Sequence, residues 1–280
     1  MQRSQENFHN TNKPLIMGIL NVTPDSFSDG GKYIHIDSAL RQVEQVLAGG
    51  ADIIDIGGES TRPGAEPVSS EEQIQRVVPV ISAIVKQFPG ATISIDTTLS
   101  TVAEAALIAG ATLINDVSAG QHDPAILSLA AKYDAPIILM HSQGSPKTMQ
   151  DNPHYTNVIT EVIDFLKARI TAAVNAGIAK ENILIDPGIG FGKRKQDNLD
   201  LLANLEQFVA LGYPVLLGTS RKRFMGSLCN VAEPSGLVNA TVATTVLGIM
   251  AGVKVFRVHD VKENRQAADV AWAIWQCRCN

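Results

Sequence analysis

Two aspartates at the ends of short apolar runs are the first candidates for chemistry in this sequence. Asp96 closes the run TISID, and Asp186 closes the run ILID. Each carboxylate would enter a partly desolvated site, where it needs hydrogen-bond donors because burying an unpaired charge is costly. A substrate with several N–H groups would supply those donors, and Asn115 could add a donor and an acceptor. Polar residues also follow other apolar runs, namely Asn21, Asp55, Asp116, His141, Ser220, Lys222, Arg257 and His259.

For some of these residues a structural role is the simpler interpretation. An aspartate after a strand commonly caps a helix or forms a turn, and Asp55, Asp116 and Asp123, each taken alone, are best explained in this way. A lone histidine such as His141 is more often a hydrogen-bonded core residue than a ligand. The chemistry is therefore predicted from the whole set rather than from any single member.

Positive charge is concentrated after two neighbouring runs near the C-terminus. The first is followed by Arg221, Lys222 and Arg223, and the second contains Arg257 and ends at His259. The formal net charge of −5 gives the chain no general attraction for nucleic acid. A local cluster of cations in such a chain predicts a subsite for an anion such as phosphate. Neither a G-x-G-x-x-G motif nor a P-loop motif occurs, so a nucleotide site of the Rossmann or P-loop type is not indicated.

Two connecting segments are longer and richer in glycine and proline than a simple link between a strand and a helix requires. They are NVTPDSFSDGG, from Asn21, and GGESTRPGAEP, from Gly57. Segments of this kind commonly carry function, and we expect both to move or to wrap a ligand.

The elements that must position these residues follow a regular alternation. Short β-branched runs alternate with segments of helical period, which is typical of repeated βα units around a parallel sheet. One such helix begins with Ser69 and Glu72 as a capping box, and another ends at Gly177. The predicted strands are 15–20, 52–56, 92–96, 112–115, 136–141, 183–186, 213–218 and 254–258. Eight strands favour a single (β/α)8 TIM barrel, of class α/β, over an open doubly wound sheet, and a barrel collects their carboxyl ends on the face used for catalysis.

Composition agrees with one intracellular domain. Hydrophobic residues make up 45% of the 280 residues, enough for a large aliphatic core. Residues 1–13 are polar, lack the pattern of a signal peptide and are expected to be a flexible terminus, so the barrel domain is placed at 14–280. No apolar run approaches the roughly 20 residues of a membrane span. Three cysteines without metal-ligand spacing favour the cytoplasm, and the small apolar segment 238–252 is expected to be buried, against a second subunit or the barrel itself.

Seven stretches, in this order, resemble the bacterial dihydropteroate synthases over nearly the whole chain. They are GILNVTPDSFSDGG, DIIDIGGESTRPGA, ISIDT, INDVS, ILIDPGIGFGK, GTSRKRFMG and VFRVHDV. The resemblance implies a homodimeric TIM barrel that joins the diphosphate ester of hydroxymethyl-dihydropterin to 4-aminobenzoate. It implies that diphosphate is released with the help of Mg²⁺, and that sulfonamides compete with 4-aminobenzoate.

The same resemblance implies roles for individual residues. Those implied to hold the pterin are Asp96, Asn115, Asp186, Lys222, Met140 and Phe191. Those implied to bind diphosphate are Asn21, Thr61, Arg257 and His259, with Asn21 also on the metal. Those implied for the aminobenzoate pocket are Phe27, Pro63, Phe191 and Ser220. Asp96, Lys222 and Arg62 are implied to be catalytic.

One position departs from the family pattern, and one related activity competes with this interpretation. Many relatives carry a serine after the lysine of GTSRK, whereas this chain has Arg223, which leaves the contacts of that position open. Corrinoid-linked methyltetrahydrofolate methyltransferases would share the ring-binding carboxylates but would not need Asn21, Arg62, Arg257 and His259 as a diphosphate clamp. A pterin-binding barrel without catalytic activity is a third possibility, in which the long loops and the cations would have no task.

Overall fold

The computed structural model describes residues 8–11, 13–22, 32–59, 66–144, 149 and 152–279. Within these residues, parallel strands form one sheet of eight. The strands are β1 (Leu15–Asn21), β2 (Ile53–Gly57), β3 (Thr92–Asp96), β4 (Leu113–Asp116), β5 (Ile137–Met140), β6 (Ile183–Asp186), β7 (Leu216–Leu217) and β8 (Val255–Val258). The strands run in the order β6-β5-β4-β3-β2-β1-β8-β7. β6 and β7 meet through the bridge between Ile185 and Val215, which brings the sheet close to a closed barrel.

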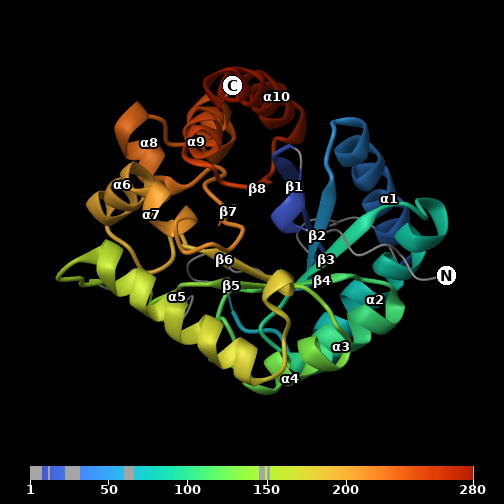
Figure 1. The fold of residues 1–280 in the computed structure, drawn as a ribbon. Coiled ribbons are helices and arrows are strands. Elements are labelled where there is room, and N and C mark those ends of the chain that lie inside the picture. The colour runs from blue at the N-terminus through green and yellow to red at the C-terminus, as the bar shows by residue number, and fades with distance from the viewer. Residues whose placement is uncertain are drawn as a thin grey trace.

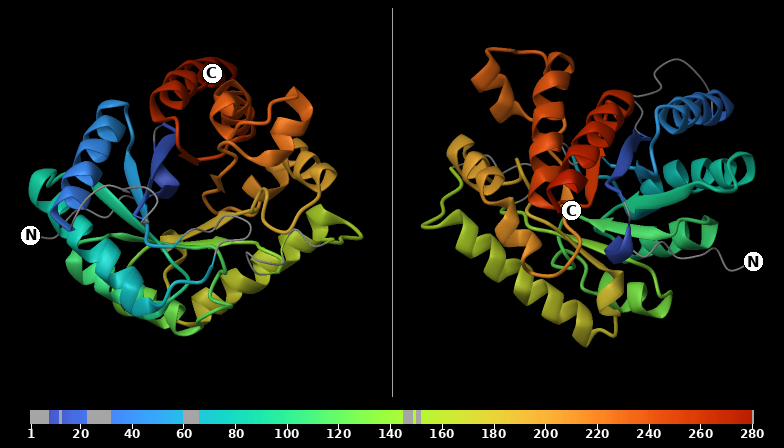
Figure 2. Two further views of the ribbon diagram at one scale, coloured as in Figure 1. Left: turned by 180° about the vertical axis from the view of Figure 1, so that it is seen from behind. Right: turned by 45° about the horizontal axis from the view of Figure 1, so that its top comes forward.

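Helices surround this sheet on its outer side (Figure 1). They are α1 (Lys32–Ala48), α2 (Ser70–Gln87), α3 (Ser100–Ala109), α4 (Ala125–Lys132), α5 (Val158–Asn175), α6 (Lys195–Ala203), α7 (Leu205–Val209), α8 (Arg223–Cys229), α9 (Val238–Ala251) and α10 (Val261–Cys279). Short 3-10 turns are η1 (Phe8–Asn10), η3 (Lys180–Asn182) and η4 (Pro234–Leu237). The two turned views in Figure 2 show the same ring of helices around the strands. The expected (β/α)8 barrel is confirmed.

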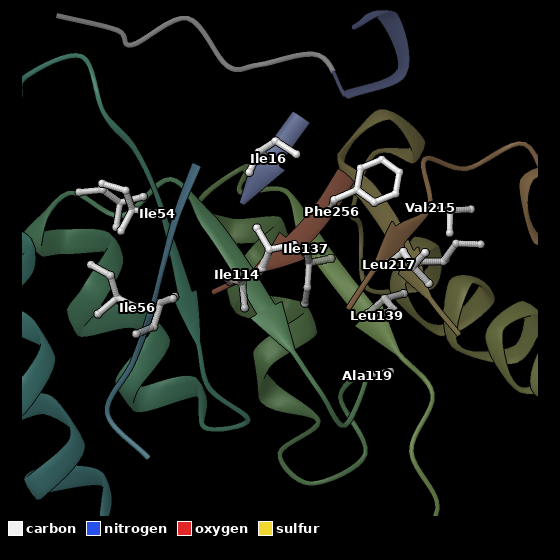
Figure 3. Close-up of a cluster of buried hydrophobic side chains, with 14 of the residues drawn as sticks. Ile16, Ile54, Ile56, Ile114, Ala119, Ile137, Leu139, Val215, Leu217 and Phe256 are labelled. Atoms are coloured by element: carbon white, nitrogen blue, oxygen red, sulfur yellow. The ribbon is translucent and has the colours of Figure 1, made fainter. Parts of the chain in front are cut away.

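The alternation of side chains along each strand separates two apolar layers. Ile16, Ile54, Ile114 and Phe256 belong to the larger layer between strands and helices, part of which is drawn in Figure 3. Their neighbours point the other way and fill the barrel interior with Leu15, Met17, Ile53, Leu113, Ile138, Leu184, Leu216 and Val255. Because side chains alternate with a period of two, the same parity sends the polar residues near the strand ends into the barrel.

Helix ends follow the predicted signals. The Ser69 hydroxyl accepts the N–H of Glu72 at 3.2 Å and caps α2. Asn157 caps α5 by accepting the N–H groups of Ile159 and Thr160. Gly177, just beyond α5, has the left-handed φ of 98° that glycine tolerates without strain.

The strand boundaries differ from the expected ones mainly at β7. Residues 213–218 were expected to be a full strand, but only Leu216–Leu217 pair as one. Tyr213 and Pro214 precede the pairing region, and proline has no N–H to give to a ladder. The wrap-around contact is instead made by the N–H of Ile185, which donates to the carbonyl of Pro214 at 3.0 Å.

The N-terminal segment is partly built into the barrel. Phe8 is 2% exposed and packs with the interior residues Leu15 and Met17. Phe8, in the turn η1, is therefore part of the interior apolar cluster of the barrel, although residues 1–13 as a whole were expected to be loose.

Helix α9 is apolar enough to resemble a membrane span. The segment Pro234–Ala251 is 18 residues long with a mean hydropathy of 1.3, which differs from the expectation that no run approaches that length. Its residues Thr241, Thr245 and Gly248 are buried, and it packs against α10 on the outside of the barrel. Length and hydropathy alone are weak grounds for a span, because helices in the core of soluble proteins meet the same criteria.

Candidate active site

The carboxyl ends of neighbouring strands bring three of the predicted site residues, Asn21, Asp96 and Asn115, to the same level of the sheet. Asn21 of β1 pairs with Gly57 of β2, Gly57 pairs with Asp96 of β3, and Asp96 pairs with Asn115 of β4. On the next part of the sheet, Met140 of β5 pairs with Asp186 of β6. Asp96, Asn115, Met140 and Asp186 are all buried. The sheet therefore gathers the predicted pterin-side residues at one end of the barrel.

Arg257 lies among the carboxylates. Its Nε donates to Asp55 Oδ2 at 2.6 Å, and its Nη2 donates to Asp96 Oδ2 at 2.7 Å. Although burial opposes it, the charges of Asp55 and Asp96 raise the pKa of the guanidinium further. β8 therefore places the guanidinium of Arg257 between the carboxylates of Asp55 and Asp96, whereas the sequence grouped Arg257 with the other cations of a predicted anion subsite.

Asp55 was expected to be a simple cap or turn residue, and the structure contradicts this. It is fully buried on the inner face of β2, where its Oδ2 also accepts the Nδ2 group of Asn115 at 3.1 Å. One oxygen thus holds both Arg257 and Asn115. The signal that could have found it is parity, since Asp55 shares the face of Ile53 and Gly57 in a strand whose other face is apolar.

Asp116 and Asp123 behave as the structural interpretation predicts. Asp116 lies on the outward parity of β4 and accepts the N–H groups of Ser118 and Gly120. Asp123 accepts the N–H groups of Ser100 and Ala125. Both carboxylates satisfy turn and helix termini rather than the barrel interior.

The carboxyl of Asp96 has a raised pKa and one oxygen without a partner among the described residues. Burial raises the pKa of Asp96 to about 7, against the opposing effect of Arg257. Its second oxygen, Oδ1, is buried and has no hydrogen-bond partner among the residues that the structure describes. Since an unpaired buried acceptor is costly, this atom is suited to receive an N–H donor from a ligand.

Asp186 and Lys222 form the other half of the site. Asp186 Oδ1 accepts the N–H of Gly188 at 2.7 Å, and burial raises the pKa of its carboxyl to about 6. Lys222 Nζ lies 3.9 Å from the centroid of the Phe191 ring. Burial lowers the pKa of Lys222 to about 8, whereas the charges of Asp186 and Asp96 raise it. Lys222 is therefore close enough to Asp186 and Asp96 for both carboxylates to affect its protonation.

The cationic cluster after β7 is divided by the structure. Arg221 forms a two-point ion pair with Asp260, through Nε at 2.9 Å and through Nη2. Lys222 turns to Phe191, and Arg223 is exposed at the start of α8. The cluster therefore does not act as one anion subsite, because Arg221 joins the loops after β7 and β8.

The joined loops bring Ser220 to His259. Ser220 Oγ accepts the backbone N–H of His259 at 3.0 Å and lies 2.9 Å from its Nδ1. Both residues were predicted site residues, and the structure places them in contact. Phe27, Thr61, Arg62 and Pro63 lie outside the described residues.

A buried lysine near the site was not recognised in the sequence. Lys193 is 3% exposed, and its Nζ lies 2.9 Å from Nδ1 of His141. His141 also meets the ring of Phe165 edge-on, so it is a core histidine as expected, although its partner is a cation. Burial, with the charge of Lys193, lowers the pKa of His141 to about 3.

The described residues offer few candidate ligands for a metal ion. Among the described residues, no three His, Cys, Asp or Glu side chains gather as a metal site. Asn21, at the end of β1, was predicted to contact a metal and remains a single candidate ligand in this region.

Comparisons with known proteins place this geometry in a family. The family model "Pterin binding enzyme" matches residues 17–259. A dihydropteroate synthase of Clostridium beijerinckii is 49% identical over 96% of this chain and 97% of its own length. The dihydropteroate synthase of Bacillus subtilis is also 49% identical, over 90% of this chain and 85% of its own.

Solved structures agree with the sequence matches. A Yersinia pestis dihydropteroate synthase in complex with a sulfonamide drug has a TM-score of 0.88 and 45% identity, over 94% of this chain and 95% of that one. A Xanthomonas albilineans dihydropteroate synthase in complex with 7,8-dihydropteroate has a TM-score of 0.83 and 42% identity, over 95% and 94%. Because the family model and these relatives match nearly the whole chain, and because its buried carboxylates lie at the strand ends, the chain belongs to the pterin binding enzymes and, among them, to the dihydropteroate synthases.

Proposed function

We propose that this chain condenses (7,8-dihydropterin-6-yl)methyl diphosphate with 4-aminobenzoate, giving 7,8-dihydropteroate and diphosphate in folate biosynthesis. The observation that carries the proposal is the set of inward acceptors Asp96, Asn115 and Asp186, with Lys222 near enough for the charges of both carboxylates to act on it. A related enzyme from Xanthomonas albilineans has been solved with 4-aminobenzoic acid, and another structure holds 7,8-dihydropteroate. The methyltransferase alternative loses support, because the relatives named above are all synthases.

The pterin edge rich in N–H groups is proposed to face Asp96, Asn115 and Asp186. Asn115 donates its Nδ2 group to Asp55, and this assignment turns its carbonyl oxygen toward the ligand as an acceptor. Asp96 offers its unpartnered Oδ1. Three acceptors on one side suit a ring edge that presents several donors, and Met140 and Phe191 supply apolar contact.

The opposite edge of the pterin is proposed to meet Lys222. An ammonium has three donors and no acceptor, so it matches the O4 and N5 acceptors of the ring. The Phe191 ring below Lys222 adds a cation–π contact that holds the ammonium in place. A pterin analogue with hydrogen-bond donors in place of O4 and N5 would therefore not be bound by Lys222.

The diphosphate is proposed to bind near Asn21, Thr61, Arg257 and His259. Ser220 accepts the backbone N–H of His259, so its hydroxyl hydrogen can point to Nδ1 and leave the ring proton on Nε2. A neutral imidazole with Nε2–H is a hydrogen-bond donor suited to a phosphate oxygen. The pairing of Arg221 with Asp260 supports this arrangement by tying together the loops after β7 and β8.

The reaction is proposed to be a displacement at the pterin methylene carbon. The bond between that carbon and the diphosphate oxygen breaks, the electron pair leaves with diphosphate, and the neutral amine of 4-aminobenzoate forms the new C–N bond and then gives up its proton. Negative charge grows on the leaving diphosphate, which His259 and the remaining N–H groups of Arg257 can stabilise as hydrogen-bond donors. Positive charge grows on the pterin, which the carboxylates of Asp96 and Asp186 can stabilise. Asp96 and Lys222, with Arg62 from the β2 loop, are the proposed catalytic residues.

Mg²⁺ is the proposed metal, with Asn21 as its protein ligand. The donor set fits, because Mg²⁺ commonly binds one or two protein oxygens together with substrate phosphates and waters. When bound, the ion supplies neutralisation of charge on the leaving diphosphate. Among the described residues no cluster of acids competes for it.

The aminobenzoate site is proposed to lie between Phe27, Pro63, Phe191 and Ser220. A sulfonamide occupies the related Yersinia pestis enzyme, and we propose that sulfonamides compete with 4-aminobenzoate here too. Arg223, exposed and close to Lys222 in sequence, distinguishes this chain from the family pattern.

A homodimer in the cytoplasm is the proposed biological form. Leu247 on α9 and Val270 and Ile274 on α10 are more than half exposed apolar side chains on two helices that pack together. Large apolar residues exposed on two helices that pack together favour an interface with a second copy over contact with water.

The decisive experiment mixes the protein, the pterin diphosphate ester, 4-aminobenzoate and Mg²⁺ and measures released diphosphate together with dihydropteroate. Equal amounts of both products are expected, with release abolished when 4-aminobenzoate is left out. The Asp186→Asn variant, folded to the same extent, serves as the matched control and should lose most of the rate. Folded wild-type protein that releases no diphosphate would exclude the proposal.

A further inference from the structure

The segment that follows β6, Pro187–Lys193, is held by a buried ammonium. We call this segment the β6 loop. Lys193 Nζ donates to the carbonyl of Gly188 at 2.7 Å and to that of Phe191 at 3.1 Å. It lies 2.9 Å from Nδ1 of His141, which comes just after β5. One cation thus joins both ends of the loop to the neighbouring strand.

The backbone of the β6 loop runs unusually close to the chain after β5. Gly188 has a φ of 69°, and a Cβ built on it would lie 1.8 Å from the carbonyl oxygen of His141. Gly192 has a φ of 63°, and its Cβ would lie 2.2 Å from the carbonyl oxygen of Gln143. Only glycine allows this approach, which leaves the loop shaped by contacts to residues 141–143.

Burying this ammonium is costly and lowers its pKa, and the charges of Asp186 and Asp197 offset this cost only in part. No ion pair joins Lys193 to a carboxylate among the residues described, and Asp186 and Asp197 act on it only at longer range. An apolar side chain would avoid the cost of burying charge but would leave the Gly188 and Phe191 carbonyls without this donor. The ammonium is therefore matched to the particular shape of the loop.

That shape governs two contacts of the proposed pterin site. The N–H of Gly188 donates to Asp186 Oδ1, and the ring of Phe191 lies under Lys222 Nζ. Gly188 and Phe191 are the same two residues whose carbonyls Lys193 holds. Moving either carbonyl moves a partner of Asp186 or of Lys222.

We propose that Lys193, held by His141, is a positioning residue of the pterin site. It sets the β6 loop so that Gly188 orients Asp186 and Phe191 supports Lys222, and it does not itself touch the substrate. This inference rests on the proposed function for the identity of the ligand. His141 takes part as a neutral imidazole whose Nδ1 accepts from the ammonium and whose Nε2 carries the proton.

The test is the affinity of the full-length protein for a pterin, 6-hydroxymethylpterin, measured by isothermal titration calorimetry, with thermal unfolding measured in parallel. Lys193→Met keeps the apolar stem and removes the donor. We expect its Kd for the pterin to rise about tenfold or more, as for loss of hydrogen bonds to a charged group.

A matched pair at His141 keeps the test valid if Lys193→Met fails to fold. His141→Asn retains a side-chain acceptor for Lys193, whereas His141→Leu removes it, and both lose the edge-on contact with Phe165. We expect both variants to lose similar stability, while only His141→Leu weakens pterin binding about tenfold.

The two hypotheses fail in different ways. Wild-type protein that does not bind the pterin would contradict the proposed function. Wild-type binding that is unchanged in Lys193→Met, or equal weakening in His141→Asn and His141→Leu, would overturn the positioning role alone.

Discussion

Replacing Asp186 by asparagine should separate binding from stability. Asp186 Oδ1 accepts the N–H of Gly188 at 2.7 Å. In Asp186→Asn the amide oxygen must keep that bond, because an NH₂ group there would face another donor. The new NH₂ then takes the place of Oδ2 and faces the N–H edge of the pterin. Loss of a charged acceptor costs about 1.5–3 kcal/mol and the facing donors add to it, so we expect about a 100-fold rise in the pterin Kd.

Stability should move in the opposite direction. Burial raises the pKa of Asp186 from 3.8 to about 6. The folded protein therefore binds this proton more tightly than the unfolded chain, and the contribution of Asp186 to stability is lost as pH rises from about 4 through about 6. The variant has no such group, so at pH 7 and above its free energy of unfolding should equal or exceed that of the wild type.

The assay combines calorimetric titration of a pterin with urea unfolding at pH 5, 6, 7 and 8. Asp123→Asn is the control, because Asp123 accepts the N–H groups of Ser100 and Ala125 away from the site. It should lose about 1 kcal/mol of stability and keep pterin affinity. Parallel loss of stability and affinity in Asp186→Asn would refute the assignment of Asp186 to the ligand.

Three further predictions concern other parts of the molecule. The reaction rate with the pterin substrate, plotted against pH, should be bell-shaped, falling below about pH 7 as Asp96 is protonated and above about pH 8 as Lys222 loses its proton. Lys222→Ala should lower kcat sharply and abolish the fall in rate at high pH. An unchanged profile in this variant would show that Lys222 is not part of the site. Asp55→Asn should destabilise the protein by about 2 kcal/mol or more and weaken pterin binding, since Arg257 and Asn115 both lose a charged acceptor. Urea unfolding measures the change in stability, and calorimetry measures the change in pterin affinity. Normal affinity would show that Asn115 is oriented by other groups. Leu247→Asp should yield a monomer by analytical ultracentrifugation, whereas a persistent dimer would place the interface elsewhere.

The fold and much of the site could be predicted from local pattern. Eight apolar runs alternating with helical segments led to the barrel, and the polar residues that end those runs led to Asp96, Asn115 and Asp186. The barrel is confirmed, and it places these residues at one end of the sheet because parallel strands in a barrel share one direction and bring their carboxyl ends to one face. The boundary of β7 was less accurate, because pairing there depends on how the sheet closes rather than on local sequence.

The pairing of charges was decided by tertiary structure. Arg257 is 202 residues from Asp55 and 161 from Asp96, and no local pattern indicates that its guanidinium enters between them. Lys193 likewise finds His141, 52 residues away, because two glycines let the β6 loop approach the end of β5.

What the sequence determined by itself was the kind of residue at each strand end and the face of the strand on which it lies, since both follow from the two-residue period of the backbone. What only the tertiary structure decided was which charge meets which. That depends on the register and curvature of eight strands at once, and a displacement of a few ångströms would exchange one partner for another.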